Sequence, residues 1–196
     1  YVTCAVRQVL EDDSRLLPVT RAFAEVDVIE LPAAGGPISL DDMDGERSGL
    51  SLETFPVPAG PARFASSELS GHTIGLVVRD ASTGGTCAFV PGCGGLDEKI
   101  LDRLGKVDLV LFDGTFWTDD ELIKLGIGDR TARQMDHMPV SGPDGSLIRL
   151  GGLERARRVY THINNTNPML LEASSERAAV EHAGLEVGMD GMRFDV

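Results

Sequence analysis

The sequence predicts an α/β or α+β domain, in which a hairpin is followed by strands that alternate with helices. Val107–Phe112 is a continuous apolar run, typical of a strand covered on both faces, and Arg158–Ile163 is a second buried strand. Helical segments at Leu96–Leu104 and Ser174–Ala183 follow strands along the chain, which is the order expected for a sheet covered by helices. The chain has 196 residues, enough for one core, and we expect a single domain over residues 1–196.

The N-terminal part is predicted to hold a short helix and two strands joined by turns. Apolar spacing predicts a helix over Cys4–Glu11, and alternation predicts strands over Phe23–Leu31 and Leu50–Val57. Pro32–Ser48 is rich in Gly, Pro and Asp, and Pro58–Gly71 in Pro, Gly and Ser, which indicates turns and an exposed loop.

The hairpin is predicted from two apolar segments, Thr73–Asp80 and Thr86–Val90, which flank a Ser-Thr-Gly-Gly turn. A tight loop at Pro91–Gly95 precedes the helix Leu96–Leu104, for which Gly105 is the expected C-cap.

The later elements are predicted from their capping residues. Thr118 and Glu121 have the spacing of a capping box that opens a helix. Ser174 is the expected N-cap of the last helix, Gly184 ends it, and Leu185–Met189 begins the last strand.

The charge balance excludes some partners. Lys and Arg total 18 against 31 Asp and Glu, giving a formal charge of −13, whereas nucleic acid and anionic membranes require clustered positive charge. Cys4, Cys87 and Cys93 fit free thiols in a reducing compartment. The apolar runs are far shorter than the roughly 20 residues that span a bilayer, and no secretory signal is recognisable, so we expect a cytoplasmic protein without a membrane span.

Three residues at predicted strand ends suggest a metal site. His72 precedes one strand, Asp113 follows Val107–Phe112, and His162 lies near the end of the second buried strand. Strand-end side chains point into the crevice where α/β folds bind ligands, and imidazole with carboxylate is a usual ligand set for zinc or iron. Each residue has a structural reading as well, as a turn aspartate or a core histidine.

The segment after His162 is a second candidate. Asn164, Asn165 and Asn167 suit neither strand nor helix continuation, and their amides could bind substrate, or hold an Asn-rich turn capped by Pro168.

A loop between the two buried strands adds further candidates. It contains His137 and Ser141, and loops of this composition often line sites, although packing explains it equally well. Ser141 lacks the GxSxG context of a nucleophile. His182 is read as a structural residue at a helix end.

These residues resemble a known family. The stretch Val107–Gly191, with VDLVLFDGTFW, HMPVSGPDG, YTHINNTNP and a closing DGM, is similar to the coenzyme pyrroloquinoline quinone (PQQ) biosynthesis protein B family. TIGL at Thr73–Leu76 and PGC at Pro91–Cys93 match as well. The resemblance covers nearly the whole chain, and HINNTNP is its specific motif.

The resemblance implies a metallo-β-lactamase-like αβ/βα sandwich of two packed sheets. By position, Asp113 and His162 would hold a divalent metal, iron or zinc, and His72 stands where the wider superfamily often has a ligand. The family's N-terminal lobe carries the cysteine motif of a structural zinc site and an Asp-His pair of the metal site, and neither motif is found here. We therefore expect these residues to form the C-terminal portion of the fold, lacking much of its N-terminal half.

The activity implied by the resemblance is metal-dependent hydroxylation of the tyrosine of the PQQ precursor peptide by a non-haem iron oxygenase. In that reading His137 is catalytic, and Asn164, Asn165, Asn167 and Ser141 contact substrate. The implied partners are the precursor peptide or PQQ and other proteins of the pathway, with a homodimer left open.

Two other functions stay open. The first is a carrier that takes PQQ or a precursor towards the periplasm without chemistry, for which Arg130 and Arg133 could bind the acid groups. The second is a metal-dependent hydrolase, although the HxHxDH cluster of the superfamily is missing from these residues.

Overall fold

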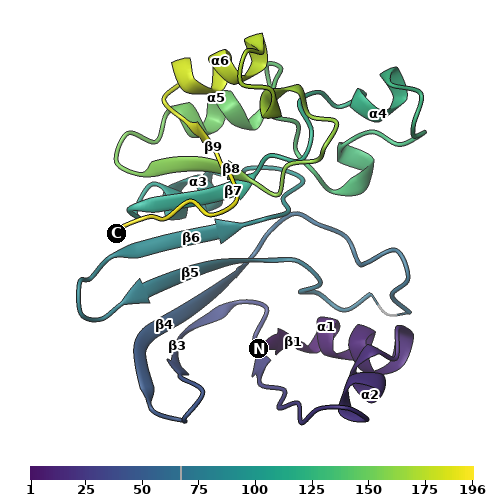
Figure 1. Ribbon diagram of the computed structural model, residues 1–196, viewed down its shortest axis with the longest axis vertical. Helices are drawn as coiled ribbons and strands as arrows, with labels where there is room; N and C mark the ends of the chain where they lie inside the picture. Colours follow the sequence, from purple (N-terminus) through teal and green to yellow (C-terminus); the bar gives the residue numbers. More distant parts are fainter. Residues whose placement is uncertain (67) are drawn as a thin grey trace.

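The computed structural model describes residues 1–66 and 68–196, and its main element is a mixed seven-stranded sheet (Figure 1). The strands occur in the order β3-β4-β5-β6-β7-β8-β9. Their bounds are Gly35–Asp41, Arg47–Pro56, Ile74–Asp80, Thr86–Val90, Leu109–Asp113, Arg157–Thr161 and Glu186–Val187. Neighbours from β3 to β6 pair antiparallel, and those from β6 to β9 pair parallel. The predicted α/β class is confirmed.

Helices lie in the connections between the parallel strands, which a tight turn cannot join. The helices are α1 Cys4–Gln8, α2 Leu16–Arg21, α3 Glu98–Leu104, α4 Glu121–Lys124, α5 Ser146–Gly151 and α6 Ser175–His182. A π-helical turn at Val9–Asp13 follows α1, and 3-10 turns lie at Arg133–Met135 and Pro168–Leu170. β1 Val2–Thr3 pairs parallel with β2 Glu30–Leu31. In the described part of the chain, no helix has both the length and the apolar character needed to cross a membrane.

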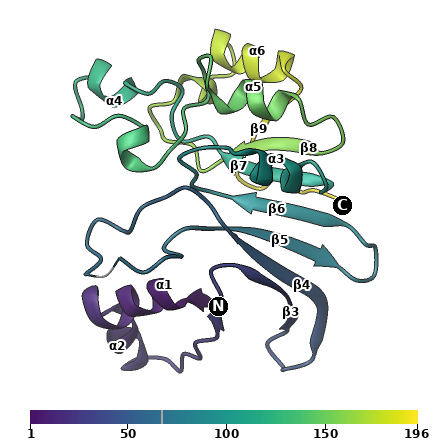
Figure 2. The same cartoon turned by 180° about the vertical axis from the view of Figure 1, so that it is seen from behind.

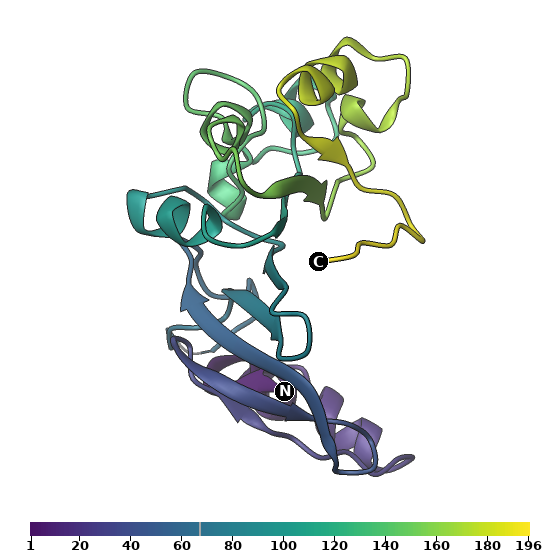
Figure 3. The ribbon, with the colours of Figure 1, turned by 90° about the vertical axis from the view of Figure 1, so that its left-hand side faces the viewer.

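The two faces of the parallel strands have different coverings. Val110, Phe112 and Tyr160 belong to the main core together with residues of α3, α5 and α6, and Figure 2 shows α3 in front of β7. Side chains alternate along a strand, so Leu111 and Val159 face the other side. The C-terminal segment runs along that other side (Figure 3).

One edge of the sheet gathers the predicted site residues. β6, β7 and β8 run parallel, so their carboxyl ends meet at this edge, and β5 is antiparallel to β6, so its start lies there too. The segments that emerge are Pro91–Gly95 after β6, residues 114–120 after β7, and residues 162–167 after β8. His72 lies two residues before β5.

Three of the predicted elements were wrong. In Phe23–Leu31 only Glu30–Leu31 forms a strand, and Phe23 is 88% exposed, so alternation without a pairing partner did not produce an extended strand. Pro32–Ser48 was predicted as turns but contains β3, because an edge strand tolerates Gly35 and Pro37 while β4 supplies its pairing.

The predicted capping box is the third error. α4 begins at Glu121 with Asp120 at the cap position, and Asp120 makes no side-chain cap bond. Glu121 is buried and bonds elsewhere, so it is not free to complete a box with Thr118. The other predicted caps are confirmed, because Gly105 is the C-cap of α3 and Ser174 accepts from the backbone N–H of Arg177 at the start of α6.

Candidate metal centre

Asp113 is the last residue of β7, and its side chain is fully buried. Oδ1 accepts from the backbone N–H of Thr115 at 3.1 Å and from its hydroxyl at 2.5 Å. Oδ2 accepts from the backbone N–H of Cys93 at 3.0 Å and lies 2.7 Å from Nδ1 of His137. A carboxylate has about four lone-pair positions, so these contacts occupy all of them. Four local donors therefore fix the carboxylate in place.

His137 reaches Asp113 from the loop between β7 and β8. Its backbone N–H donates to Ala132 at 3.0 Å, and the next residue, Met138, donates to the carbonyl of Cys93 at 2.7 Å. These bonds tie the loop to the segment after β6, and the His137 side chain is 19% exposed. The ring of Phe116 also packs against the His137 ring in a T-shaped arrangement, at a centroid distance of 5.9 Å.

His162 directly follows β8 and has a left-handed backbone, with φ of 53°. This conformation is unfavourable for a residue with a Cβ atom and persists only where the surroundings hold it. Thr115 provides such a hold, because its Oγ1 lies 2.9 Å from Nδ1 of His162. The His162 side chain is 54% exposed.

The hydrogen bonds assign the tautomers of both imidazoles. Asp113 can only accept, so Nδ1 of His137 donates to it and Nε2 keeps a lone pair. Thr115 has a single hydroxyl proton, which goes to the carboxylate as the stronger acceptor, so Nδ1 of His162 donates to Oγ1. In both histidines Nε2 therefore keeps a free lone pair, with which it can bind a metal or accept a proton.

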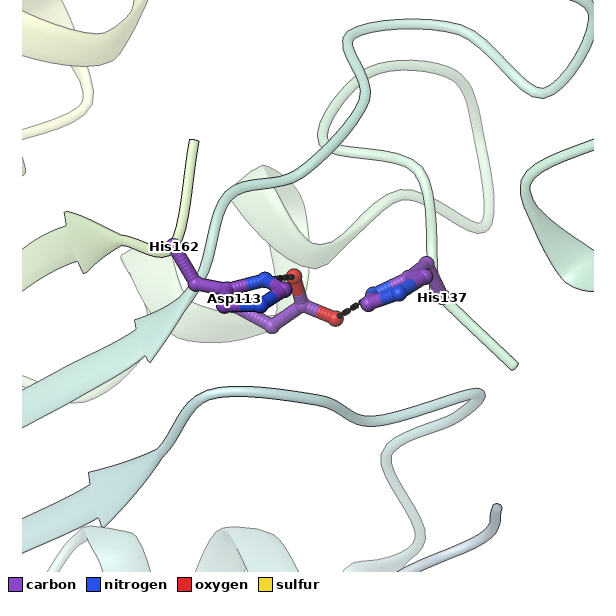
Figure 4. A group of neighbouring side chains, drawn as sticks. All are labelled: Asp113, His137 and His162. Atoms are coloured by element: carbon purple, nitrogen blue, oxygen red, sulfur yellow. Dashed lines mark hydrogen bonds and ion pairs between the residues drawn. The ribbon is translucent and has the colours of Figure 1, made fainter. Parts of the chain in front are cut away.

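Asp113, His137 and His162 form one group (Figure 4), in which one ligand atom from each lies within 4.8 Å of the others. The two imidazoles stack at a centroid distance of 5.5 Å and an interplanar angle of 19°. The donor set suits a divalent metal. His162, being exposed and oriented through Nδ1, is ready to act as a ligand, whereas Asp113 would first have to lose a hydrogen bond. The bonds of Asp113 suit a carboxylate that orients the His137 imidazole from behind, and its role as a metal ligand stays a prediction.

His72 lies outside this group, and its predicted role as a ligand stays a prediction. Among the described residues, its buried Nε2 has no hydrogen-bond partner. It lines the same hollow of about 310 Å³ as His137, together with Arg63 and Arg130.

The predicted substrate residues fall into different environments. Asn167 is buried, donates to the carbonyl of Gly114 at 2.9 Å and accepts from Met169, so it holds the loop. Asn165 is exposed and Asn164 half-buried. Ser141 donates to the carbonyl of Trp117 at 2.7 Å. Substrate contact by these residues stays a prediction. His182, exposed at the end of α6, does not belong to the group.

A second hollow is lined in part by His162. It has about 380 Å³ and is lined by apolar side chains, among them Leu111, Val159, Met189 and Phe194. Its apolar side chains offer a surface for an aromatic ring next to the exposed imidazole, and Thr161 and Asp190 add polar groups to the lining.

Sequence analysis missed Thr115 and Cys93 as supports of the centre. Thr115 had a signal, because a hydroxyl residue two positions after a strand-end aspartate can bond back to it. Cys93 acts through its backbone N–H, which carries no sequence signal. Burial raises the pKa of the Cys93 thiol to about 11, and burial also raises the pKa of Tyr160 behind the site.

Comparisons with known proteins agree on one family. The family model described as a β-lactamase superfamily domain matches residues 1–163. Coenzyme PQQ synthesis protein B of Pseudomonas entomophila is 47% identical over 148 residues, covering 73% of this chain and 48% of the relative. The protein of that name from Cupriavidus necator is 37% identical over 198 residues, covering 99% of this chain and 63% of the relative.

A solved structure shows the same likeness. The crystal structure of zinc-bound PqqB from Methylobacterium extorquens superposes with a TM-score of 0.82 at 34% identity, covering 100% of this chain and 64% of that one. The chain thus spans about half to two thirds of the length of these relatives. The fold, the matching family model and these relatives lead to one assignment: the chain belongs to the β-lactamase superfamily and, within it, to the family of coenzyme PQQ synthesis protein B.

Proposed function

We propose that this protein acts in the synthesis of coenzyme PQQ, in metal-dependent hydroxylation of the tyrosine ring of the precursor. The observation that carries the proposal is the group Asp113, His137 and His162 at the carboxyl edge of the sheet. The relatives named coenzyme PQQ synthesis protein B supply the pathway. The zinc in the relative from Methylobacterium extorquens supports a divalent metal.

The residues divide the work as follows. His162 holds the metal through Nε2, since Thr115 occupies Nδ1. When bound, iron supplies the redox chemistry for activating O₂. His137 accepts or returns a proton at the phenol through its Nε2, and Asp113 keeps that imidazole in the required tautomer. The remaining metal ligands belong to the part of the family's fold that these residues do not include.

The hollows beside the group suit this substrate class. The apolar hollow at His162 accepts an aromatic ring. Arg63 and Arg130 line the hollow at His137, where they can bind carboxylates of the precursor. Asp136 lines the same hollow and opposes such binding in part.

Carriage of PQQ is the second candidate, and the arginine-lined hollow is the observation that favours it. Arg130 lies there, whereas Arg133, the other arginine expected for this role, is not among its lining residues. A carrier needs the acid-binding hollow without the proton-transfer pair. The hydrogen-bonded pair of Asp113 and His137 therefore favours the catalytic function over the carrier function.

Oxygen consumption by the iron-reconstituted protein tests the proposal. With a tyrosine-containing precursor and ascorbate as the two-electron reductant, we expect oxygen uptake and a product heavier by one oxygen atom, while the second atom of O₂ leaves as water. His162→Ala should abolish both the iron content and turnover, while His182→Ala, an exposed histidine away from the group, should leave both unchanged. Tight PQQ binding without turnover would favour the carrier, and unchanged metal content in His162→Ala would overturn the site.

A further inference from the structure

Glu121 is a buried acid that the proposed chemistry does not use. It is the first residue of α4, and only 6% of it is exposed. Among the described residues it forms no ion pair with a cation. A buried acidic group without a counter-charge is costly unless hydrogen bonds satisfy it. The hydrogen bonds of the Glu121 carboxylate must therefore offset the cost of its burial.

The two oxygens of Glu121 bind two different loops. Oε2 accepts from the backbone N–H of Trp117 at 2.6 Å, within the segment that follows β7. Oε1 accepts from the hydroxyl of Thr166, 45 residues further on in the segment that follows β8. The first bond is local and would by itself be a turn-stabilising contact. The second joins the loop that carries Asp113 and Thr115 to the loop that begins at His162.

The chain of bonds continues towards His162. Thr166 accepts from Nδ2 of Asn164 at 2.6 Å, and the backbone N–H of Asn164 donates to the carbonyl of Thr115 at 3.1 Å. Asn164 lies two residues after His162, whose left-handed backbone needs support from its surroundings. The loop after β8 is thus held at two points: at Asn164 by the carbonyl of Thr115, and at Thr166 by the carboxylate of Glu121. We call the second link, from Glu121 through Thr166 to Asn164, the bridge.

We propose that Glu121 is a positioning residue for His162, which acts through Thr166 and Asn164 to hold the imidazole in its metal-binding orientation. Glu121 touches neither substrate nor metal in this account. Its role is to fix the distance between the two loops that carry the group. The inference rests on the proposed metal-binding role of His162, and the experiment below separates the two.

Paired substitutions test the bridge. Glu121→Gln keeps the volume but can accept through one oxygen only, and Thr166→Val keeps the shape of Thr166 without its hydroxyl. We expect each to raise the dissociation constant for Fe²⁺ or Zn²⁺, measured by competition with a chromophoric chelator, by about tenfold. The double variant should be no weaker than the single ones, because both remove the same link. Glu172→Gln, an exposed glutamate, is the matched control and should bind as the unaltered protein does.

Two measurements on the metal-free protein, amide exchange and the imidazole tautomer, complete the test. In the metal-free protein, amide exchange at Asn164 should be faster in both single variants, and the Nδ1–H tautomer signature of His162 in ¹⁵N NMR spectra should weaken. Thr166→Ser, which restores a hydroxyl, should recover both readings and the affinity. A residue that only stabilised the fold would lower the unfolding midpoint without changing the tautomer.

The outcomes separate the two proposals. Additive losses in the double variant, or an unchanged tautomer and affinity in Glu121→Gln, would overturn the role of Glu121. If His162→Ala leaves metal affinity unchanged, the proposed function fails, and the exchange and tautomer readings alone then decide for or against the bridge.

Discussion

The hydroxyl of Thr115 lies 2.9 Å from both Nδ1 and the main-chain oxygen of His162. The same hydroxyl lies 2.5 Å from Oδ1 of Asp113. One side chain thus connects the buried acid to the exposed imidazole, while the 3.9 Å separation between Nδ1 and Oδ1 is too long for a direct hydrogen bond. Through Thr115, the buried Asp113 at the end of β7 orients the imidazole of His162.

Thr115→Val tests this connection. Valine keeps the shape of threonine but removes the hydroxyl, so Nδ1 of His162 loses its acceptor and the ring loses its preferred tautomer. We expect the metal dissociation constant, measured by chelator competition, to rise about tenfold. The free energy of unfolding should fall by about 1–2 kcal/mol in denaturant titrations. Thr115→Ser keeps the hydroxyl and should retain the affinity; equal weakening by both variants would contradict the connection.

The backbone of His162 gives a second prediction. At φ of 53° a side chain with a Cβ atom is strained, and glycine is not. In the metal-free protein His162→Gly should therefore be more stable to denaturant than His162→Ala by about 1 kcal/mol. Both variants lose the imidazole, so the comparison isolates the backbone conformation. Equal stability, or a more stable alanine variant, would show that the left-handed conformation is not maintained in solution.

Much of the sheet was predictable because a strand that is buried on both faces consists of consecutive apolar residues. Leu109–Asp113 and Arg157–Thr161 are central strands, so their apolar character marks them without knowledge of their partners. Gly35–Asp41 is an edge strand with glycine and proline, and only its pairing with β4 makes it extended. Such an element depends on contacts between distant residues, which local propensity does not contain.

The candidate site was predictable to a similar degree. Asp113 and His162 stood out because they lie at the ends of buried strands, and the parallel register brings them to one edge. His137 sits in a long loop, and its contact with Asp113 depends on how that loop returns to Cys93. Glu121 was read as a local cap, whereas its decisive bond is to Thr166, 45 residues away.

Asp113→Asn gives a third prediction. Each carboxylate oxygen accepts from a different backbone N–H, Oδ1 from Thr115 and Oδ2 from Cys93. Whichever way an asparagine amide is turned, its NH₂ group faces one of these donors and leaves it unpaired. We expect a loss of about 2–3 kcal/mol in the free energy of unfolding, measured by denaturant titration. Asp129→Asn, at an exposed position, should change stability by less than about 0.5 kcal/mol. A loss at Asp113 no larger than this would mean that the four bonds do not hold the carboxylate.

Cys93 provides a prediction for alkaline pH. Burial raises the pKa of its thiol from 9.0 to about 11. Between these values the unfolded chain releases the proton while the folded chain keeps it, so the folded state loses stability as the pH rises. This contribution is intact below pH 9 and lost by about pH 11, and it amounts to about 2–3 kcal/mol. Cys93→Ala lacks it, whereas Cys87 and Tyr160 titrate in both proteins. The stability difference between the unaltered protein and the variant, measured by denaturant titration, should therefore shrink by that amount from pH 8 to pH 11. A difference that stays constant over this range would show that Cys93 ionises as readily in the folded chain as in the unfolded one.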